Sequence, residues 1–415
     1  MTLIPRLSRC APGSPRADDA PSGDRGAHER VARPVPSGVP PVISFDAVIE
    51  LFQGYCDADP TYCAQLAAYA GGERILDLAQ GLSPDALVPV YSSSKGAAAV
   101  VISLLVQRGQ LNLDETVVSY WAEFAQAGKG AISVRQLLSH QAGLLGVDNG
   151  FSWEELMAHT GLAERLAAQR PFWQPGQGFM YHAVTIGTLA DELVRRVDGR
   201  TLAQMLLEDV VAPRRIDVWM GTPEAEDGRV VSALPPTAEE VDAYFARSPD
   251  ALSGGDGLSA LALPRGGILD MLDRVNSVAM RRAGAPAVGA LASARGLAAL
   301  YASLRHDLNG CPRLLTDDTI GKVSQIQVAG REMGTGMSPV RFGVMFQVPC
   351  PTRWPFGTPT AFGHDGAGGS LAFYDPGVDV SFGYTVQRLP LPGGLDKRAI
   401  ELARVVRQCI GDEHA

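Results

Sequence analysis

The chain has 415 residues, of which 46% are hydrophobic and 20% charged, as is usual for a globular protein large enough for two lobes or domains. The net charge of −9 and the scattered arginines argue against nucleic acid or an anionic membrane as a partner, because neither surface attracts an acidic protein. The six cysteines form no CxxC pair and no metal-ligand spacing with histidine. No apolar run reaches the length of a membrane span.

Residues 1–40 are predicted to be a disordered tail. Prolines recur, arginines interrupt the tract and apolar periodicity is absent, so the segment cannot bury enough surface to offset its conformational entropy. The tail also lacks the continuous apolar core of a secretory signal. We therefore expect a reduced, cytoplasmic protein whose cysteines are free thiols.

Order is expected to begin with a helix near residues 44–55. A β-hairpin then follows, because residues 63–69 and 73–78 flank the pair Gly71-Gly72, and glycines readily take the positive φ of a tight turn.

Ser92 and Lys95 stand three residues apart at the start of a predicted buried helix, in the stretch Ser92-Ser93-Ser94-Lys95. Residues i and i+3 share a helix face, so the hydroxyl and the amine would be neighbours. The apolar residues that follow would remove water from the lysine and lower its pKa toward the range in which a neutral amine accepts a proton. The pair is a candidate nucleophile with its base, although a helix-capping serine beside a surface lysine has the same spacing.

Residues 112–215 show a helical pattern, with helices expected at 114–124, 134–139, 153–170, 185–197 and 201–211. Gly199 is expected to be the C-cap of the fourth. Residues 222–285 are predicted to include a loop-rich insertion, and 294–304 a further helix. Strands are expected at 342–348, 371–374 and 378–386, followed by an amphipathic helix at 396–410.

Strands at both ends of the chain with helices between them predict an α/β (α+β) fold. Its antiparallel sheet would be built from both termini and flanked by helices, with an inserted, mostly helical lobe. We expect one domain at about 41–412, with an α/β lobe at about 41–90 and 290–412 and a helical lobe at about 91–289.

Two further segments add chemistry to the serine–lysine pair. Tyr181 lies just before the helix expected at 185–197, where its hydroxyl could face a cleft. Residues 363–370 are dense in glycine, which permits a close backbone approach to a ligand, and a strand-edge N–H there could face a developing oxyanion. His140 and His182 are instead predicted to be framework residues.

With these motifs in this order, the chain resembles the serine β-lactamase-like superfamily of class C β-lactamases, D-Ala-D-Ala peptidases, esterases and acyltransferases. The resemblance covers roughly residues 43–412. It rests on the SxxK at 92–95, the tyrosine motif at 181–183, the His-x-Gly at 364–366 and the framework stretch at 137–144. It implies a β-lactamase/transpeptidase-like fold.

The resemblance also implies roles for three side chains. Ser92 would be the acylated nucleophile, Lys95 would keep it deprotonated or shuttle its proton, and Tyr181 would act as general base and acid. No metal or organic cofactor is expected.

The substrate side of the site is implied in the same way. The oxyanion hole would consist of the backbone N–H groups of Ser92 and Ala367, with Ala367 directly after Gly366. His364 would orient the substrate or tune the proton affinity of Tyr181.

The chain departs from this pattern at Ala183, where class C enzymes carry an asparagine whose amide orients an amide-bearing substrate. The class A deacylation motif Glu-x-x-Leu-Asn is also absent from the sequence.

The sequence therefore predicts a serine hydrolase that forms an acyl-enzyme, best described as a carboxylesterase on small or medium acyl esters. The alternatives are an acyltransferase of secondary metabolism, then a β-lactamase, a D-Ala-D-Ala peptidase or a non-catalytic binding protein. The expected partner is a small acyl ester or an acyl donor and acceptor.

Overall fold

The computed structural model describes residues 44–247, 257–265, 267–334 and 339–411. The predicted tail at 1–40 lies outside the described residues.

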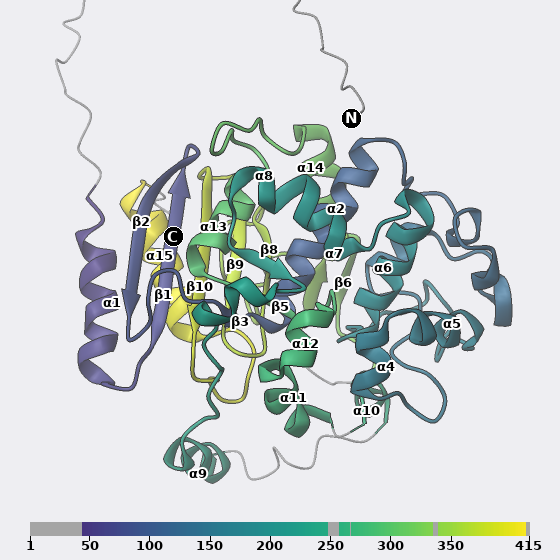
Figure 1. Ribbon diagram of the computed structural model, residues 1–415, viewed down its shortest axis with the longest axis horizontal. Helices are drawn as coiled ribbons and strands as arrows, with labels where there is room; N and C mark the ends of the chain where they lie inside the picture. Colours follow the sequence, from purple (N-terminus) through teal and green to yellow (C-terminus); the bar gives the residue numbers. More distant parts are fainter. Residues whose placement is uncertain (1–43, 248–256, 266, 335–338, 412–415) are drawn as a thin grey trace, which may run out of the picture. The chain divides into compact units, whose positions relative to one another are not determined.

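A five-stranded antiparallel sheet organises the fold, with the strand order β2-β1-β10-β9-β8 (Figure 1). Two strands come from the beginning of the described chain, β1 (Ala64–Ala70) and β2 (Glu73–Gln80), and form the hairpin predicted around Gly71-Gly72. Three come from its end: β8 (Phe362–Asp365), β9 (Leu371–Asp375) and β10 (Val380–Val386). The predicted fold class, a sheet built from both ends of the chain, is confirmed.

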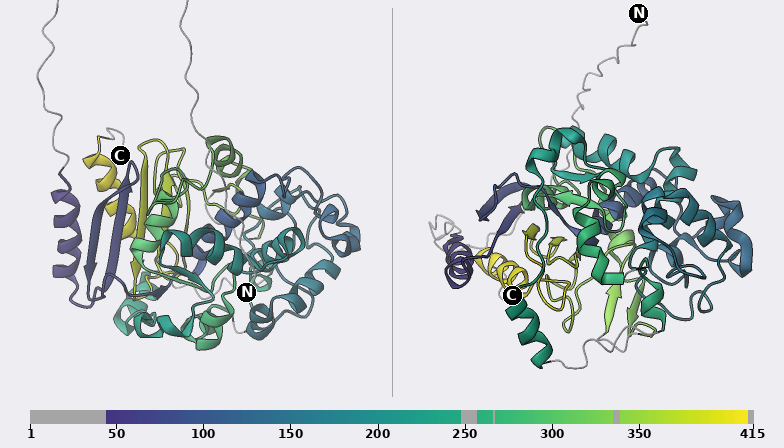
Figure 2. Two further views of the ribbon diagram at one scale, coloured as in Figure 1. Left: turned by 45° about the horizontal axis from the view of Figure 1, so that its top comes forward. Right: turned by 60° about the horizontal axis from the view of Figure 1, so that its bottom comes forward.

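Helices cover both faces of this sheet (Figures 1 and 2). On one face, α1 (Asp46–Ala58) and α15 (Lys397–Cys409) pack against each other and share a core with alternate residues of β1 and β10. On the other face lies α13 (Ala294–Ala302). A Cβ added to Gly383 of β10 would lie 2.3 Å from the carbonyl oxygen of Ala294, so this glycine permits the close packing of α13 on the sheet.

The helix predicted after the serines is present in two parts. A 3-10 turn, η1 (Tyr91–Ser93), leads into α2 (Ser94–Gln107), which is buried from Ser94 to Leu105. It is an all-round apolar helix of the core, and it packs against α6 (Thr185–Asp198), which ends at Gly199 in the left-handed conformation as predicted.

The remaining helical segments are η2 (Val117–Ser119), η3 (Ala122–Gly128), α3 (Val134–Leu138), α4 (Trp153–Ala158), α5 (Thr160–Ala168), α7 (Leu202–Met205), η4 (Leu206–Val211), α8 (Ala212–Arg214), η5 (Glu224–Arg229), α9 (Ala238–Arg247), α10 (Leu258–Leu261), α11 (Gly267–Asn276), α12 (Val278–Ala283) and α14 (Asp317–Ser324). The small strands are β3 (Val88–Pro89), β4 (Val218–Met220), β5 (Ala290–Ala292), β6 (Val328–Gly330) and β7 (Val340–Phe342). The predicted lobe boundaries stay a prediction.

The helix predicted at 114–124 is wrong. The Val117 N–H donates to the Ile132 carbonyl, and the Val134 N–H donates to the Glu115 carbonyl. These bonds pair the segment with a later part of the chain and leave only short 3-10 turns. The predicted helix at 153–170 is broken at His159, whose φ is +61°.

The strand predicted at 342–348 is also wrong beyond Phe342. The Gly343 N–H donates to the Phe346 carbonyl and closes a turn, and Met345, at φ +59°, donates its N–H to Leu138. The chain turns at 343–346 in place of a continuous strand, and Gln347 then pairs with Gly363 of β8.

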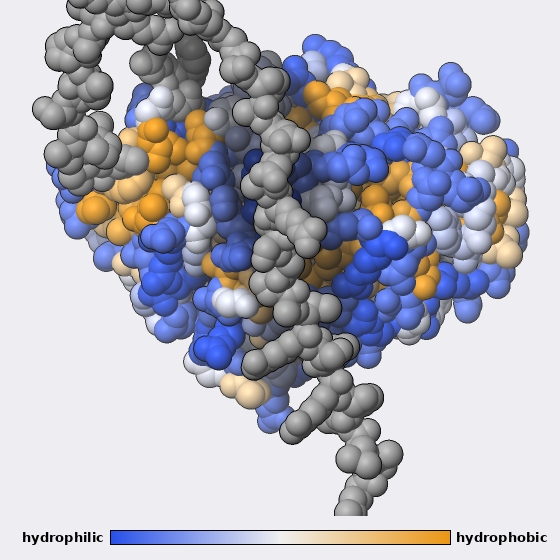
Figure 3. Space-filling view, turned by 90° about the horizontal axis from the view of Figure 1, so that it is seen from above, coloured by the Kyte–Doolittle hydropathy of each residue, from blue (hydrophilic) through white to orange (hydrophobic). Residues whose placement is uncertain are grey.

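In the described part of the chain, no helix is long and apolar enough to cross a bilayer. On the face shown in Figure 3, apolar areas alternate with hydrophilic ones.

Candidate active site

A cavity of about 690 Å³ contains Ser92 and lies where η1, the loop before α6 and the end of β8 meet. Each of these three segments, which are distant in sequence, supplies one polar side chain to the cavity. These side chains are Ser92, Tyr181 and Asp365. The other residues lining it are Met180, Ala183, Val184, Ser259, Ala262, Leu263, Met271, Val288, Glu332, Gln347, Thr352, Arg353, Trp354, Ala367, Pro392, Gly393, Gly394 and Leu395. The cavity is therefore lined by both apolar and polar side chains.

Ser92 and Lys95 are in contact, as their spacing predicts. Lys95 Nζ lies 3.0 Å from Ser92 Oγ and donates to the carbonyl oxygen of Ala287 at 2.9 Å. The lysine is fully buried in the first turn of α2, and this burial lowers its pKa to about 7, with the nearby Asp365 carboxylate opposing the shift. Near neutral pH a large share of Lys95 is therefore a neutral amine that can accept a proton.

The two serines between this pair hold the backbone of the turn. Ser93 Oγ donates to the carbonyl oxygen of His364 at 3.2 Å, which ties η1 to β8. Ser94 Oγ accepts the Ala290 N–H at 3.0 Å, which ties α2 to β5. Tyr91, directly before Ser92, has φ +47°, a conformation that is uncommon for a non-glycine residue and that occurs at functional sites.

Tyr181 faces this pair. Its side chain interacts with that of Ser92, and its ring centroid lies 4.8 Å from Lys95 Nζ. Burial raises the pKa of Tyr181 well above its ordinary value, and the negative charges of Asp365 and Glu332 add to the effect. The side chain is therefore a neutral phenol at neutral pH, and this form can donate a proton.

Glycines bring the turn after β8 against η1. A Cβ at Gly366 would lie 2.3 Å from the Val90 carbonyl oxygen, and one at Gly368 would lie 2.4 Å from the Tyr91 ring. Ala367 thereby lines the same cavity as Ser92. Within the described ranges the Ala367 N–H has no backbone acceptor, and the Ser92 N–H lies in the first turn of η1, where helical acceptors are lacking. This arrangement suits the predicted oxyanion hole.

His364 is fully buried and is not among the residues that line the cavity. Its Nδ1 donates to the Asp365 carbonyl at 2.7 Å, and its ring centroid lies 6.0 Å from that of Tyr181. Burial lowers the pKa of His364 to about 3, so the ring is neutral. An influence of His364 on the reaction would act through Tyr181 or Lys95.

Several groups at the site are not predicted from the sequence. The Ala287 carbonyl holds Lys95, and Glu332 Oε1 accepts the Tyr181 N–H at 2.7 Å. Gln347 and Asp365 form a reciprocal pair: Gln347 Nε2 donates to Asp365 Oδ1 at 2.7 Å, and the Asp365 N–H donates to Gln347 Oε1 at 2.9 Å. Each contact joins segments distant in sequence, so no local pattern indicates it. Among the described side chains, no group of three or more His, Cys, Asp or Glu residues is arranged to hold a metal ion.

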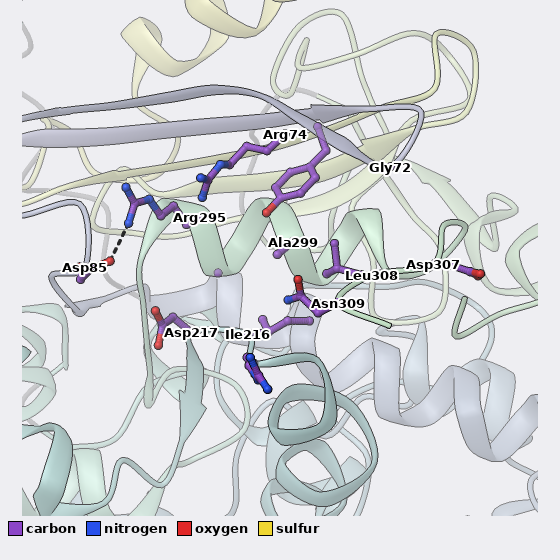
Figure 4. Close-up of a pocket in the computed structure, with 13 residues that line it drawn as sticks. Gly72, Arg74, Asp85, Ile216, Asp217, Arg295, Ala299, Asp307, Leu308 and Asn309 are labelled. Carbon is purple, nitrogen blue, oxygen red and sulfur yellow. Dashed lines mark hydrogen bonds and ion pairs between the residues drawn. The ribbon is translucent and has the colours of Figure 1, made fainter. Parts of the chain in front are cut away.

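A second cavity of about 490 Å³ lies between the β1–β2 hairpin, the start of α13 and the segment before β4 (Figure 4). Its charged side chains largely pair with one another or with close neighbours. Arg295 bonds to Asp85 and to Asp77, and Asp217 pairs with Arg229. None of the predicted site residues lines it. The Ser92 cavity is therefore the candidate active site.

A model of the β-lactamase family matches residues 48–406, so the chain belongs to this family. The superfamily resemblance of the three motifs is confirmed.

Individual relatives indicate the kind of enzyme. The esterase/β-lactamase LipL of Mycobacterium tuberculosis is 30% identical over 358 residues, which span 79% of this chain and 77% of LipL. The structure of EstA from Arthrobacter nitroguajacolicus Rue61a is 39% identical, with a TM-score of 0.82 over 89% of this chain and 98% of EstA. A family VIII carboxylesterase structure is 29% identical, with a TM-score of 0.75 over 88% of this chain and 97% of that chain. The protein is a β-lactamase-related serine hydrolase.

Proposed function

We propose that the protein is a carboxylesterase that cleaves small or medium acyl esters through an acyl-enzyme on Ser92. The observation that carries this proposal is the 3.0 Å contact between Ser92 Oγ and a buried Lys95 amine whose pKa is about 7. A hydroxyl beside a neutral amine is an activated nucleophile. The names of two relatives, an esterase/β-lactamase and a carboxylesterase, support ester hydrolysis.

In acylation, Ser92 Oγ attacks the ester carbonyl carbon while its proton passes to Lys95 Nζ. The N–H groups of Ser92 and Ala367 stabilise the oxyanion. When the tetrahedral intermediate collapses, the C–O bond to the alcohol breaks and Tyr181 donates its hydroxyl proton to the leaving oxygen. Tyr181 then regains a proton from the Lys95 ammonium, so the acyl-enzyme forms with the free alcohol as product.

In deacylation, a water molecule takes the position of the alcohol. Its proton passes through Tyr181 to Lys95 as its oxygen attacks the acyl carbon. The bond to Ser92 Oγ breaks, Oγ recovers a proton from Lys95 and the carboxylic acid leaves. The same two groups therefore serve both half-reactions, as microscopic reversibility requires.

The two kinds of lining residue suggest how each half of the ester is bound. Val184, Leu263, Met271 and Val288 supply an apolar wall for the acyl chain. The polar lining residues Gln347 and Arg353 would face the alcohol. The proposed partner is accordingly a small ester, and the cytoplasmic location stays a proposal that cell fractionation would test.

The experiment compares the wild-type protein with Ser92→Ala on nitrophenyl esters of graded chain length, with and without added alcohols or amines. The esterase proposal expects hydrolysis that is lost in Ser92→Ala, while the melting temperature of the variant stays close to that of the wild type. Slow hydrolysis that gives way to faster ester or amide formation when an acceptor is added would assign the acyltransferase activity instead. Hydrolysis that persists unchanged in Ser92→Ala would refute the mechanism.

A further inference from the structure

The three consecutive backbone N–H groups around Tyr181 all donate outside their own segment. The Met180 N–H donates to the His140 carbonyl oxygen at 3.2 Å, the Tyr181 N–H to Glu332 Oε1 at 2.7 Å and the His182 N–H to His140 Nδ1 at 3.1 Å. The segment lies before the first turn of α6, so no helical ladder fixes it. Two residues, His140 and Glu332, thus hold the backbone that carries the phenol.

His140 has a single possible protonation state in this arrangement. Its Nδ1 accepts an N–H and so carries a lone pair, which places the ring proton on Nε2. The side chain is fully buried, and burial keeps its pKa well below the ordinary value. Protonation at Nδ1 would turn the acceptor into a donor facing the His182 N–H. The imidazole is therefore held neutral with a defined acceptor atom.

The backbone and ring of His140 are both placed for this contact. Its φ is +67°, a conformation that costs free energy for a residue with a Cβ, and the hydrogen bonds to residues 180 and 182 offset that cost. Its ring centroid lies 5.0 Å from that of Tyr181 and 4.5 Å from that of Phe342. Phe342 in turn stacks on Tyr181 at 5.8 Å. The phenol ring is thus packed against the residue that anchors its backbone.

Glu332 is the second residue that holds this segment. It is 8% exposed, lines the Ser92 cavity and comes from the loop after β6, 151 positions from Tyr181. Its neighbour Met333 donates its N–H to the Phe179 carbonyl at 3.0 Å, so this loop is fixed to the segment in two places.

We propose that His140 and Glu332 are positioning residues that set the Tyr181 hydroxyl against the leaving oxygen of the substrate. The sequence predicts His140 to be a framework residue, and the proposal assigns it this specific task. The inference rests on the proposed esterase function, in which Tyr181 protonates the leaving alcohol. A displacement of the phenol by about 1 Å would lower the rate about 100-fold without removing any group from the cavity.

The first test is a matched pair at position 140. In His140→Asn, an amide oxygen can reach the place of Nδ1, and asparagine tolerates a positive φ. In His140→Gln, the amide reaches toward the place of Nε2 and leaves the His182 N–H without its acceptor. We expect His140→Asn to keep kcat within about 3-fold and His140→Gln to lose about 10- to 100-fold, with KM changed less than about 2-fold in both.

A second pair of variants tests Glu332. It keeps the proposal testable if substitutions at position 140 prevent folding. Glu332→Gln keeps an oxygen acceptor for the Tyr181 N–H, whereas Glu332→Met removes it at similar volume. We expect Glu332→Gln to keep most of kcat. We expect Glu332→Met to lose about 10- to 100-fold in kcat, as His140→Gln does.

The decisive measurement is the dependence on the leaving group. A nitrophenol leaves without full protonation, but an alkyl alcohol needs the Tyr181 proton. If His140 and Glu332 position Tyr181, His140→Gln and Glu332→Met lose at least about 10-fold more kcat/KM, which reports acylation, on an alkyl ester than on the nitrophenyl ester of the same acid. Equal losses of kcat/KM on both esters, or unchanged kcat/KM in both variants, would overturn the inference. Its failure is distinct from that of the proposed function, which would appear as wild-type activity that survives Ser92→Ala.

Discussion

The Lys95 amine and the Ala287 carbonyl oxygen are 2.9 Å apart, although 192 positions separate the two residues in the chain. The contact fixes Nζ beside Ser92 Oγ in a buried environment, where the pKa of the lysine is about 7. Only the neutral amine accepts the serine proton. Activity should therefore fall as pH decreases through this value, because protonation removes the base.

A pH profile of kcat/KM on a nitrophenyl ester checks this. We expect a plateau above the pKa of Lys95 and a decline of about tenfold per pH unit below it. Lys95→Arg should lose at least about 1000-fold at every pH, since a guanidinium stays protonated. A wild-type profile that is flat between pH 5 and 9, with melting temperature constant over that range, would contradict Lys95 as the base.

The close approach of Gly366 to Val90 leads to a second prediction. Because a Cβ at 366 would lie 2.3 Å from a backbone oxygen, Gly366→Ala should force the turn away from η1 and misplace the Ala367 N–H. Loss of one oxyanion donor costs about 100-fold or more in kcat. Gly161→Ala is the matched control, since Gly161 is exposed in α5 and nothing lies within 4 Å of a Cβ added there, and it should be neutral or stabilising by up to about 1 kcal/mol. Steady-state kinetics and thermal unfolding of both variants decide the matter, and equal kcat values would exclude this role for the turn.

The sequence predicted those parts of the site that depend on short spacing. Ser92 and Lys95 meet because they are three residues apart at the start of a helix, and the β1–β2 hairpin forms because two glycines occupy its turn. The order of three motifs also indicated the family and hence the fold, which the family match confirms. The roles assigned to the site residues stay predictions.

The contacts that complete the site could not be predicted from local patterns. Ala287 contributes a carbonyl oxygen, which any residue type would supply, so its side chain gives no signal. Glu332 lies 151 positions from Tyr181, and His140 lies about 40 positions from it. Neither residue belongs to a repeating sequence pattern that would indicate such a contact. The prediction of a helix at 114–124 failed for a related reason. The backbone of this segment forms hydrogen bonds with residues 132–134 instead of the hydrogen bonds of a helix.

The apolar wall of the cavity predicts how acyl-chain length can be changed. Val288→Phe would fill part of the space next to Val184 and Met271. We expect kcat/KM for hexanoate esters to fall about 10-fold while that for acetate esters changes less than about 3-fold, since a lost pair of methylene contacts is worth about 1–3 kcal/mol. Val278→Phe is the control, because Val278 is 54% exposed on α12 and should leave the profile unchanged. An unchanged ratio of hexanoate to acetate rates in Val288→Phe would place the acyl chain elsewhere in the cavity.

Ala183 lies in the same cavity wall as Tyr181 and is half-buried, so a side-chain amide at this position would face the bound substrate. Ala183→Asn would add one donor and one acceptor suited to an amide, and such a pair strengthens recognition only of substrates that match it. We expect the ratio of kcat/KM for a β-lactam to that for a simple nitrophenyl ester to rise by about 10-fold. Ala183→Leu is the matched control, because it adds similar volume without polar atoms and should not raise this ratio. If both variants shift the ratio equally, volume rather than the absence of a side-chain amide at position 183 sets the substrate preference of this site.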